Sequence, residues 1–178
     1  GSAASWGTVS AGITEADQWR VASGENYSQH LGWNWGNSNL ILDDYWERDD
    51  NTQFFNKLGT GMTQSSGVFT FPSTGIWLVT YRLDGRTHSA HSNHLNYQIE
   101  VSDDSGSNFS IQTTPHINAS QPTGAFQYFS GQQETIVDVT NASTFRIRFN
   151  IEPIANLHIH GNSSYNTTCV SFIRLGDT

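Results

Sequence analysis

Two histidines separated by one residue form the clearest metal-ligating pattern in this sequence. They are His158 and His160 in the segment LHIHG. In an extended strand their imidazoles lie on one side, about 6 to 7 Å apart. Two imidazoles cannot enclose a metal ion, but three copies of the chain around an axis would supply six nitrogens, an octahedral set for a transition metal. The alternatives are an axial metal site and a strand pair that binds no metal.

A tryptophan-rich segment offers a second kind of site. In LGWNWG, Trp33 and Trp35 project to the same side if the segment is extended, with Asn34 between them and Tyr27 and His30 ahead of them. Flat aromatic faces stack on the apolar C–H patches of sugars, while polar side chains bond the hydroxyls. These five residues form the candidate glycan-binding site. The alternative is that the segment packs against its own fold or against a partner copy.

Carboxylates gather in the segment DDYWERDD. They are Asp43, Asp44, Glu47, Asp49 and Asp50. Such a cluster is typical of a solvated loop face. It also resembles what Ca²⁺ requires, because that ion takes several oxygen ligands from one neighbourhood. The sequence leaves both interpretations open, with the solvated face favoured.

The composition excludes two classes of partner. The chain has 16 acidic and 8 basic side chains, for a formal net charge of -8, and Lys57 is its one lysine. Nucleic-acid binding depends on clusters of Lys and Arg, so no nucleic-acid partner is expected. No apolar stretch approaches the length of a membrane span, so no membrane partner is expected either. The initial Gly-Ser is typical of a protease-site scar, which suggests a longer native chain.

Short strands, rather than helices, are expected to position these groups. A length of 178 residues suits one domain, and 12% aromatic residues among many turn formers favour an all-β fold over disorder. Strands are predicted at residues 67–71, 75–84, 95–102, 108–114, 125–130, 134–140, 144–151, 156–160 and 168–175. The N-terminal WGTVSAGI is expected to be extended, and ITEADQWRVAS to form a turn or one helical loop. The whole predicts an antiparallel β-sandwich of jelly-roll type.

Three segments resemble the globular head of the C1q/TNF-like superfamily. FFNKLGTGMTQSSGVFTFPSTGIWLVTYRL combines a Gly-aromatic-Thr strand, a Pro-x-x-Gly turn and an aromatic-rich strand. FSGQQETIVDVTNASTFRIRF is similar to the later hairpin of that family, and GNSSYNTTCVSFIRLGDT is similar to its closing strand. The resemblance covers residues 40–178, the expected head, while residues 1–39 add an N-terminal strand and the Trp-rich loop to the same domain. It implies a C1q/TNF-like jelly roll and a homotrimer.

A finer resemblance points to bacteriophages. GITEADQWR, KLGTGMTQSSGVFTFPSTGIWLV and the terminal SFIRLGDT look like C-terminal domains of structural proteins from marine bacteriophages. Such domains occur as fibre, tail or capsid-attached modules. The resemblance implies a virion protein that is made in the host cytoplasm, acts outside the cell and has other virion proteins as partners.

The two strands around the turn at residues 72–75 are apolar on both faces. Phe69 and Phe71 share one side of the first strand, Trp77 and Tyr81 share one side of the second, and apolar residues also occupy the opposite sides. A strand buried on both faces is covered by its own fold or by a partner, and a threefold assembly supplies the partner. These four aromatic residues are therefore expected at a trimer interface. The alternative is that loops of the same chain cover the second face.

These observations predict a non-enzymatic virion module with no catalytic residues. It would be a trimeric head on a phage fibre or capsid that recognises a host surface, in particular its glycans. One alternative is a capsid decoration or assembly knob without a specific ligand. Another is a polysaccharide depolymerase, which would need a carboxylate pair at a suitable distance, such as Asp103 and Asp104. No cofactor is expected beyond the open alternatives of an axial transition metal or Ca²⁺.

Overall fold

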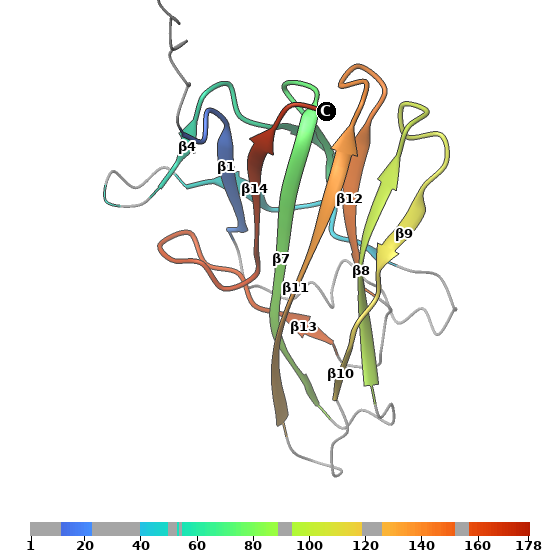
Figure 1. Cartoon of the computed structure of the whole chain (residues 1–178). Helices are drawn as coiled ribbons and strands as arrows, with labels where there is room; N and C mark the ends of the chain where they lie inside the picture. Colours follow the sequence, from blue (N-terminus) through green and yellow to red (C-terminus); the bar gives the residue numbers. More distant parts are fainter. Residues whose placement is uncertain are drawn as a thin grey trace, which may run out of the picture.

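The computed structural model describes residues 12–22, 40–49, 53, 55–88, 94–118, 126–151 and 157–178. These residues form two antiparallel sheets that pack face to face (Figure 1). The predicted all-β antiparallel sandwich is therefore confirmed. The described residues include no helix of the length and apolarity that a membrane crossing requires.

Strands far apart in the sequence lie side by side in each sheet. The first sheet has the order β11 (Phe126–Val139), β7 (Gly75–His88), β14 (Cys169–Gly176), β1 (Ala16–Val21) and β3 (Trp46–Arg48), with β13 (His158–Ile159) paired to β7 and β4 (Lys57–Leu58) paired to β1. The second sheet has the order β10 (His116–Asn118), β8 (His94–Ser102), β12 (Arg146–Ile151), β6 (Val68–Thr70) and β5 (Thr63–Ser65), with β2 (Leu40–Ile41) paired to β12 and β9 (Ser110–Thr113) paired to β8.

Strand β11 is continuous, whereas the sequence analysis predicts two strands at 125–130 and 134–140. The intervening SGQQ lacks apolar side chains and therefore looks like a turn. All 14 residues of β11 nevertheless pair with β7. Gly131 suits this strand because a Cβ there would lie 2.6 Å from the Tyr97 hydroxyl oxygen. Pairing along the whole of β7 overrides the local break.

The segment around Trp19 is a strand inside the first sheet, so the prediction of a turn or helical loop for it is wrong. Strand β1 pairs with β14 on one side and with β3 and β4 on the other. Its sequence hides this role because Asp17 and Arg20 are buried, at 1% and 0% exposure. Polar residues thus occupy positions where a buried strand usually has hydrophobic ones.

Aromatic rings fill the space between the two sheets. The ring of Phe69 lies 5.4 Å from that of Trp46, 5.6 Å from that of Phe149 and 5.4 Å from that of Phe172, measured between centroids. These four rings come from β6, β3, β12 and β14, so both sheets contribute. Edge-to-face and tilted contacts of this kind add to the stabilisation from burial alone.

The four aromatic residues assigned to a trimer interface belong to this core. Phe69 and Tyr81 are 0% exposed, Trp77 is 1% exposed and Phe71 is 2% exposed within a single chain. A partner copy can bury no further area on rings that are already covered. The interface assignment is therefore corrected, because the opposite sheet of the same chain covers these residues.

Both ends of the described chain lie at one end of the sandwich. Gly12 and Thr14 line a pocket together with Gly176 and Asp177. Strand β7 begins at this end and β14 finishes there, next to the C-terminus (Figure 1). We call it the upper end. The lower end is the opposite one, where β7 finishes and β11 begins.

Candidate functional site

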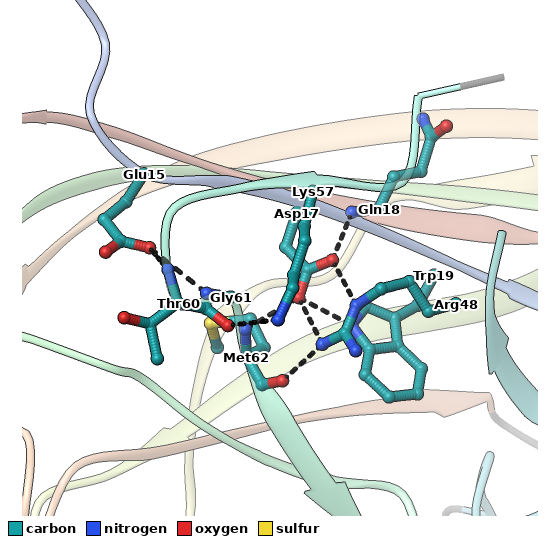
Figure 2. A network of polar contacts seen from close by, with 9 residues as sticks. All are labelled: Glu15, Asp17, Gln18, Trp19, Arg48, Lys57, Thr60, Gly61 and Met62. Atoms are coloured by element: carbon teal, nitrogen blue, oxygen red, sulfur yellow. Dashed lines mark hydrogen bonds and ion pairs between the residues drawn. The ribbon is translucent and has the colours of Figure 1, made fainter. Parts of the chain in front are cut away.

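A network of carboxylates and backbone amides ties the start of β1 to the loop between β4 and β5 (Figure 2). Glu15 Oε2 accepts hydrogen bonds from the backbone N–H groups of Thr60 and Gly61, at 2.9 and 3.2 Å. Asp17 Oδ2 accepts one from the backbone N–H of Met62 at 2.6 Å. We call this arrangement of Glu15, Asp17 and the loop the carboxylate clamp.

Two glycines allow the carboxylates to approach the loop. Gly59 and Gly61 have φ values of +74° and +76°, in the left-handed region that favours glycine. A Cβ on Gly59 would lie 2.5 Å from the Glu15 carboxylate carbon, and one on Gly61 would lie 2.9 Å from Asp17 Oδ2. The segment KLGTGM is therefore shaped to receive both acidic side chains.

The buried carboxylate of Asp17 is paired with Arg48. Arg48 Nε donates to Asp17 Oδ1 and Arg48 Nη2 to Asp17 Oδ2, each at 2.9 Å. Trp19 Nε1 donates to the same carboxylate at 3.0 Å, and the guanidinium lies 4.4 Å from the centroid of the Trp19 ring. Both carboxylate oxygens are engaged within the chain, so the clamp is suited to holding structure rather than to binding a substrate.

The acidic cluster divides between solvent and core. Asp43 and Asp44 are exposed, as a solvated face predicts. Glu47 and Asp49 instead bind the buried Arg20, with Nε–Oε1 and Nη1–Oδ2 distances of 2.7 and 3.1 Å. The solvated-face prediction is therefore wrong for Asp49, which is 1% exposed.

A cation-binding role for this cluster finds no support in the described geometry. Asp50 lies outside the described residues, and Arg20 already supplies the positive charge for two of the other carboxylates. Within the described ranges no group of three or more His, Cys, Asp and Glu residues is placed to hold a metal ion.

The outer face of the first sheet carries a row of apolar residues near the upper end. Strand register places Ile136 beside Leu78, Leu78 beside Ile173, Ile173 beside Ala16, and Ala16 beside Leu58. The row thus crosses β11, β7, β14, β1 and β4. Ile136 is 62% exposed and Leu58 is 43% exposed. We call these five residues the apolar row.

Ionisable and aromatic residues occupy the same face nearer the lower end. His158 and His160 have ring centroids 5.4 Å apart, so the prediction that they share one side is confirmed. His160 Nδ1 lies 2.6 Å from Asp84 Oδ1 on β7, and its ring centroid lies 5.9 Å from that of Tyr128 on β11. Register places Arg86 beside both Tyr128 and His158. We call Arg82, Asp84, Arg86, Phe126, Tyr128 and His160 the lower cluster.

Three ionisable groups have shifted pKa values, and burial raises that of the Tyr97 hydroxyl. Hydrogen bonds from the Ser102 hydroxyl and from the Asn108 backbone and side chain lower the pKa of Asp104 to about 2. Asp104 belongs to an exposed hairpin loop, and its bonds hold that loop. Burial raises the pKa of the Cys169 thiol, and the positive charge of Arg82 opposes this only in part. A raised pKa keeps Cys169 a thiol rather than a reactive thiolate.

The remaining sequence candidates lie elsewhere. Tyr27, His30, Trp33, Asn34 and Trp35 are outside the described residues, so the glycan site predicted there stays a prediction. The lower cluster contains groups that the sequence analysis does not single out. A signal for them exists in YRLDGRTH, since a strand continued past its predicted end would place Arg82, Asp84 and Arg86 on one face.

Comparisons with known proteins identify the fold. No protein-family model and no curated protein sequence matches this chain. Among solved structures, the Eiger TNF of S. frugiperda is similar with a TM-score of 0.64 and 10% identity, over 94% of this chain and 96% of that one. Murine APRIL at pH 8.5 is similar with a TM-score of 0.56 and 12% identity, over 90% of this chain and 98% of that one. Murine APRIL at pH 8.0 gives the same TM-score at 11% identity. The chain has the two-sheet jelly-roll fold of TNF-like proteins.

Proposed function

We propose that this protein is a non-enzymatic, homotrimeric head of a phage fibre or capsid that attaches the virion to glycans of the host surface. The observation that carries the proposal is the apolar row on the outer face of the first sheet. The proposed self-association surface is therefore the outer face of the first sheet, and of the four core aromatics only Trp77 and Tyr81 share a strand with it, on the inner side of β7.

The apolar row supports self-association because it crosses five strands, and of its members only Ala16 is buried within the single chain. Isolated exposed apolar residues are common on monomers, whereas contiguous ones mark an interaction surface. Ile13 and Leu175, at 51% and 52% exposure, add apolar surface near the ends of β1 and β14. A closed threefold arrangement would bury such a strip on every copy and leave none exposed.

A non-enzymatic role is consistent with how the acidic residues are used. Glu15, Asp17, Glu47 and Asp49 are engaged by backbone amides or by arginines of the same chain. Asp104 is engaged within its own hairpin. A glycosidase needs two carboxyl groups that face a common substrate space, whereas these five are engaged by groups of their own chain.

The phage part of the proposal rests on the resemblance of three segments to C-terminal domains of marine bacteriophage structural proteins. Two of the three phage-like segments, GITEADQWR and KLGTGMTQSSGVFTFPSTGIWLV, supply the opposite sides of the carboxylate clamp (Figure 2). The two segments therefore form one structural unit, which fixes β1 against the β4–β5 loop.

The self-association proposal is tested by Ile136→Asp. We expect the unaltered protein to have the mass of a trimer by size-exclusion chromatography with light scattering at micromolar concentration. Ile136→Asp should have the mass of a monomer, because an unpaired carboxylate would be buried in each contact. Ile111→Asp is the matched control, since Ile111 is 49% exposed on the second sheet.

If the unaltered protein had the mass of a monomer, the trimer would be refuted. If Ile136→Asp and Ile111→Asp changed the mass equally, the assignment of the contact to the apolar row would be refuted. Attachment is tested separately with intact host cells and with virus particles that lack this protein. Binding to cells supports the attachment role. Binding to the particles alone would instead identify a capsid decoration knob.

A further inference from the structure

Two arginines on the outer face of the first sheet lack the partners that the other basic residues have. All eight Lys and Arg residues belong to the described chain. Arg20, Arg48, Arg148 and Arg174 pair with carboxylates, while Lys57 and Arg146 donate to backbone carbonyls. Arg82 and Arg86 have no described carboxylate or carbonyl within bonding distance. In a chain of net charge -8, two guanidinium groups on one strand without a carboxylate or carbonyl partner among the described residues are an exception, and Arg86 instead lies against the Phe126 ring.

These two guanidinium groups flank a fixed His–Asp pair. Arg82, Asp84 and Arg86 alternate along the outer face of β7. Asp84 Oδ1 binds His160 Nδ1 at 2.6 Å, and the backbone N–H of His160 donates to the Asp84 carbonyl at 2.9 Å. The Thr167 hydroxyl also donates to the His160 carbonyl, at 2.9 Å. With Nδ1 held in this way, His160 Nε2 and Asp84 Oδ2 remain for other hydrogen bonds.

Two exposed aromatic rings complete the lower cluster. Phe126 and Tyr128 share the outer face of β11 and are 51% and 61% exposed. Arg86 Cζ lies 4.6 Å from the centroid of the Phe126 ring, so the guanidinium and the ring lie against each other. The Tyr128 ring lies next to His160. An apolar platform therefore adjoins hydrogen-bonding groups and positive charge.

We propose that the lower cluster binds an acidic carbohydrate, a sugar that carries a carboxylate. Guanidinium groups bind carboxylates through paired hydrogen bonds, and Arg86 and Arg82 are the groups available for this. The Tyr128 ring, which is 61% exposed, stacks on the C–H face of the sugar ring, with the Phe126 ring and Arg86 beside it. His160 Nε2 and Asp84 Oδ2 bond its hydroxyls. A neutral sugar would leave both guanidinium groups unused, which is why the acidic class is favoured.

The position of the cluster agrees with this role. Gly12 and Gly176 mark the upper end of the sandwich. The lower cluster comes from the opposite end of β7 and from the start of β11 (Figure 1), apart from Leu78 and Ile136 of the apolar row, so self-association through that row leaves it accessible. The remainder of the chain is acidic and repels an anionic ligand, so the two guanidinium groups select where it binds. This inference rests on the proposed attachment function and names its ligand class.

The test is a titration of the purified protein with trigalacturonic acid and with sialyllactose, each beside its methyl ester, by calorimetry. We expect at least one of the acids to bind, and its ester to bind about tenfold more weakly, because esterification removes the charge. Arg86→Gln should lower the affinity about tenfold, and Tyr128→Ala should lower it as well. Arg146→Gln, on the second sheet, is the matched control and should leave the affinity unchanged.

Light scattering on the same variants separates this inference from the trimer. If both acids fail to bind to a protein that is trimeric, the acidic-carbohydrate site is refuted and the assembly stands. The site is also refuted if acid and ester bind with equal affinity, or if Arg86→Gln and Arg146→Gln lower the affinity for the acid equally. Dissociation of the trimer in Arg86→Gln, with a native circular dichroism spectrum, would show instead that the lower cluster contacts a partner copy.

Discussion

Asp17 accepts hydrogen bonds from the backbone N–H groups of Gln18 and Met62, from Trp19 Nε1 and from two nitrogens of Arg48. Removing one partner of a buried ion pair leaves the other charge uncompensated. Asp17→Asn should therefore lower the free energy of unfolding by about 3 kcal/mol. Urea unfolding at fixed protein concentration measures this loss through the midpoint.

The control for this substitution is Asp103→Asn. Asp103 is exposed in the hairpin loop after β8, and loss of its charge should change the free energy of unfolding by less than about 0.5 kcal/mol. Similar small changes in both variants would mean that the clamp contributes little to stability.

At the scale of elements, the turn between β5 and β6 is set by its backbone. Ser66 and Gly67 have φ values of 48° and 74°, and two positive φ values in a two-residue connection define a type I′ hairpin. A Cβ on Gly67 would lie 2.3 Å from the Leu42 carbonyl oxygen and 2.7 Å from Asp43 Cα. Both are backbone atoms, so neither can rotate aside.

Gly67→Ala should therefore destabilise the fold by about 3 kcal/mol, the sum of left-handed strain and a steric clash. Gly106→Ala separates the cost of the left-handed backbone from the cost of the steric clash. Gly106 has a φ of +90°, but a Cβ there meets no atom closer than 3.6 Å, so its cost should be about 1 kcal/mol of strain. Thermal unfolding of both variants gives the comparison. Equal losses would show that the contact with residues 42 and 43 relaxes.

The elements that the sequence predicts well are those with an unbroken period of two. Strands at 95–102, 144–151 and 168–175 agree with β8, β12 and β14 to within two residues. Strand β1 is missed because Asp17 and Arg20 interrupt the apolar pattern, and only partners from distant segments reveal why they are buried. Local patterns carry no information about such partners.

The same distinction applies to the candidate site. The spacing of His158 and His160 is enough to place their rings together. Asp84 is 76 residues away from His160, and only the pairing of β13 with β7 brings them into contact. The apolar row likewise depends on the register of five strands, so no single segment displays it. A sequence pattern predicts which side chains share one face of a strand, but only the register between strands decides which side chains become neighbours.

At the scale of the whole molecule, the outer face of the first sheet is divided along its length. Apolar residues lie toward the upper end, with the chain ends, and the guanidinium groups and exposed aromatic rings lie toward the lower end. Three copies joined through the apolar rows would therefore present three lower clusters in the same direction. Each cluster has few groups, so single contacts with a sugar are expected to be weak.

Assembly should convert these weak contacts into firm attachment. For a surface coated with polygalacturonate or a sialylated polymer, the unaltered protein, if trimeric, should reach half-saturation at a concentration about 10² lower than Ile136→Asp, because the second and third contacts of one trimer are intramolecular. In solution, a single trisaccharide should bind both proteins equally, since the lower cluster lies within one chain. Surface plasmon resonance gives the first quantity and calorimetry the second. If Ile136→Asp lost affinity for the soluble sugar as well, the site would extend across copies, and linkage of three independent sites would no longer describe the attachment.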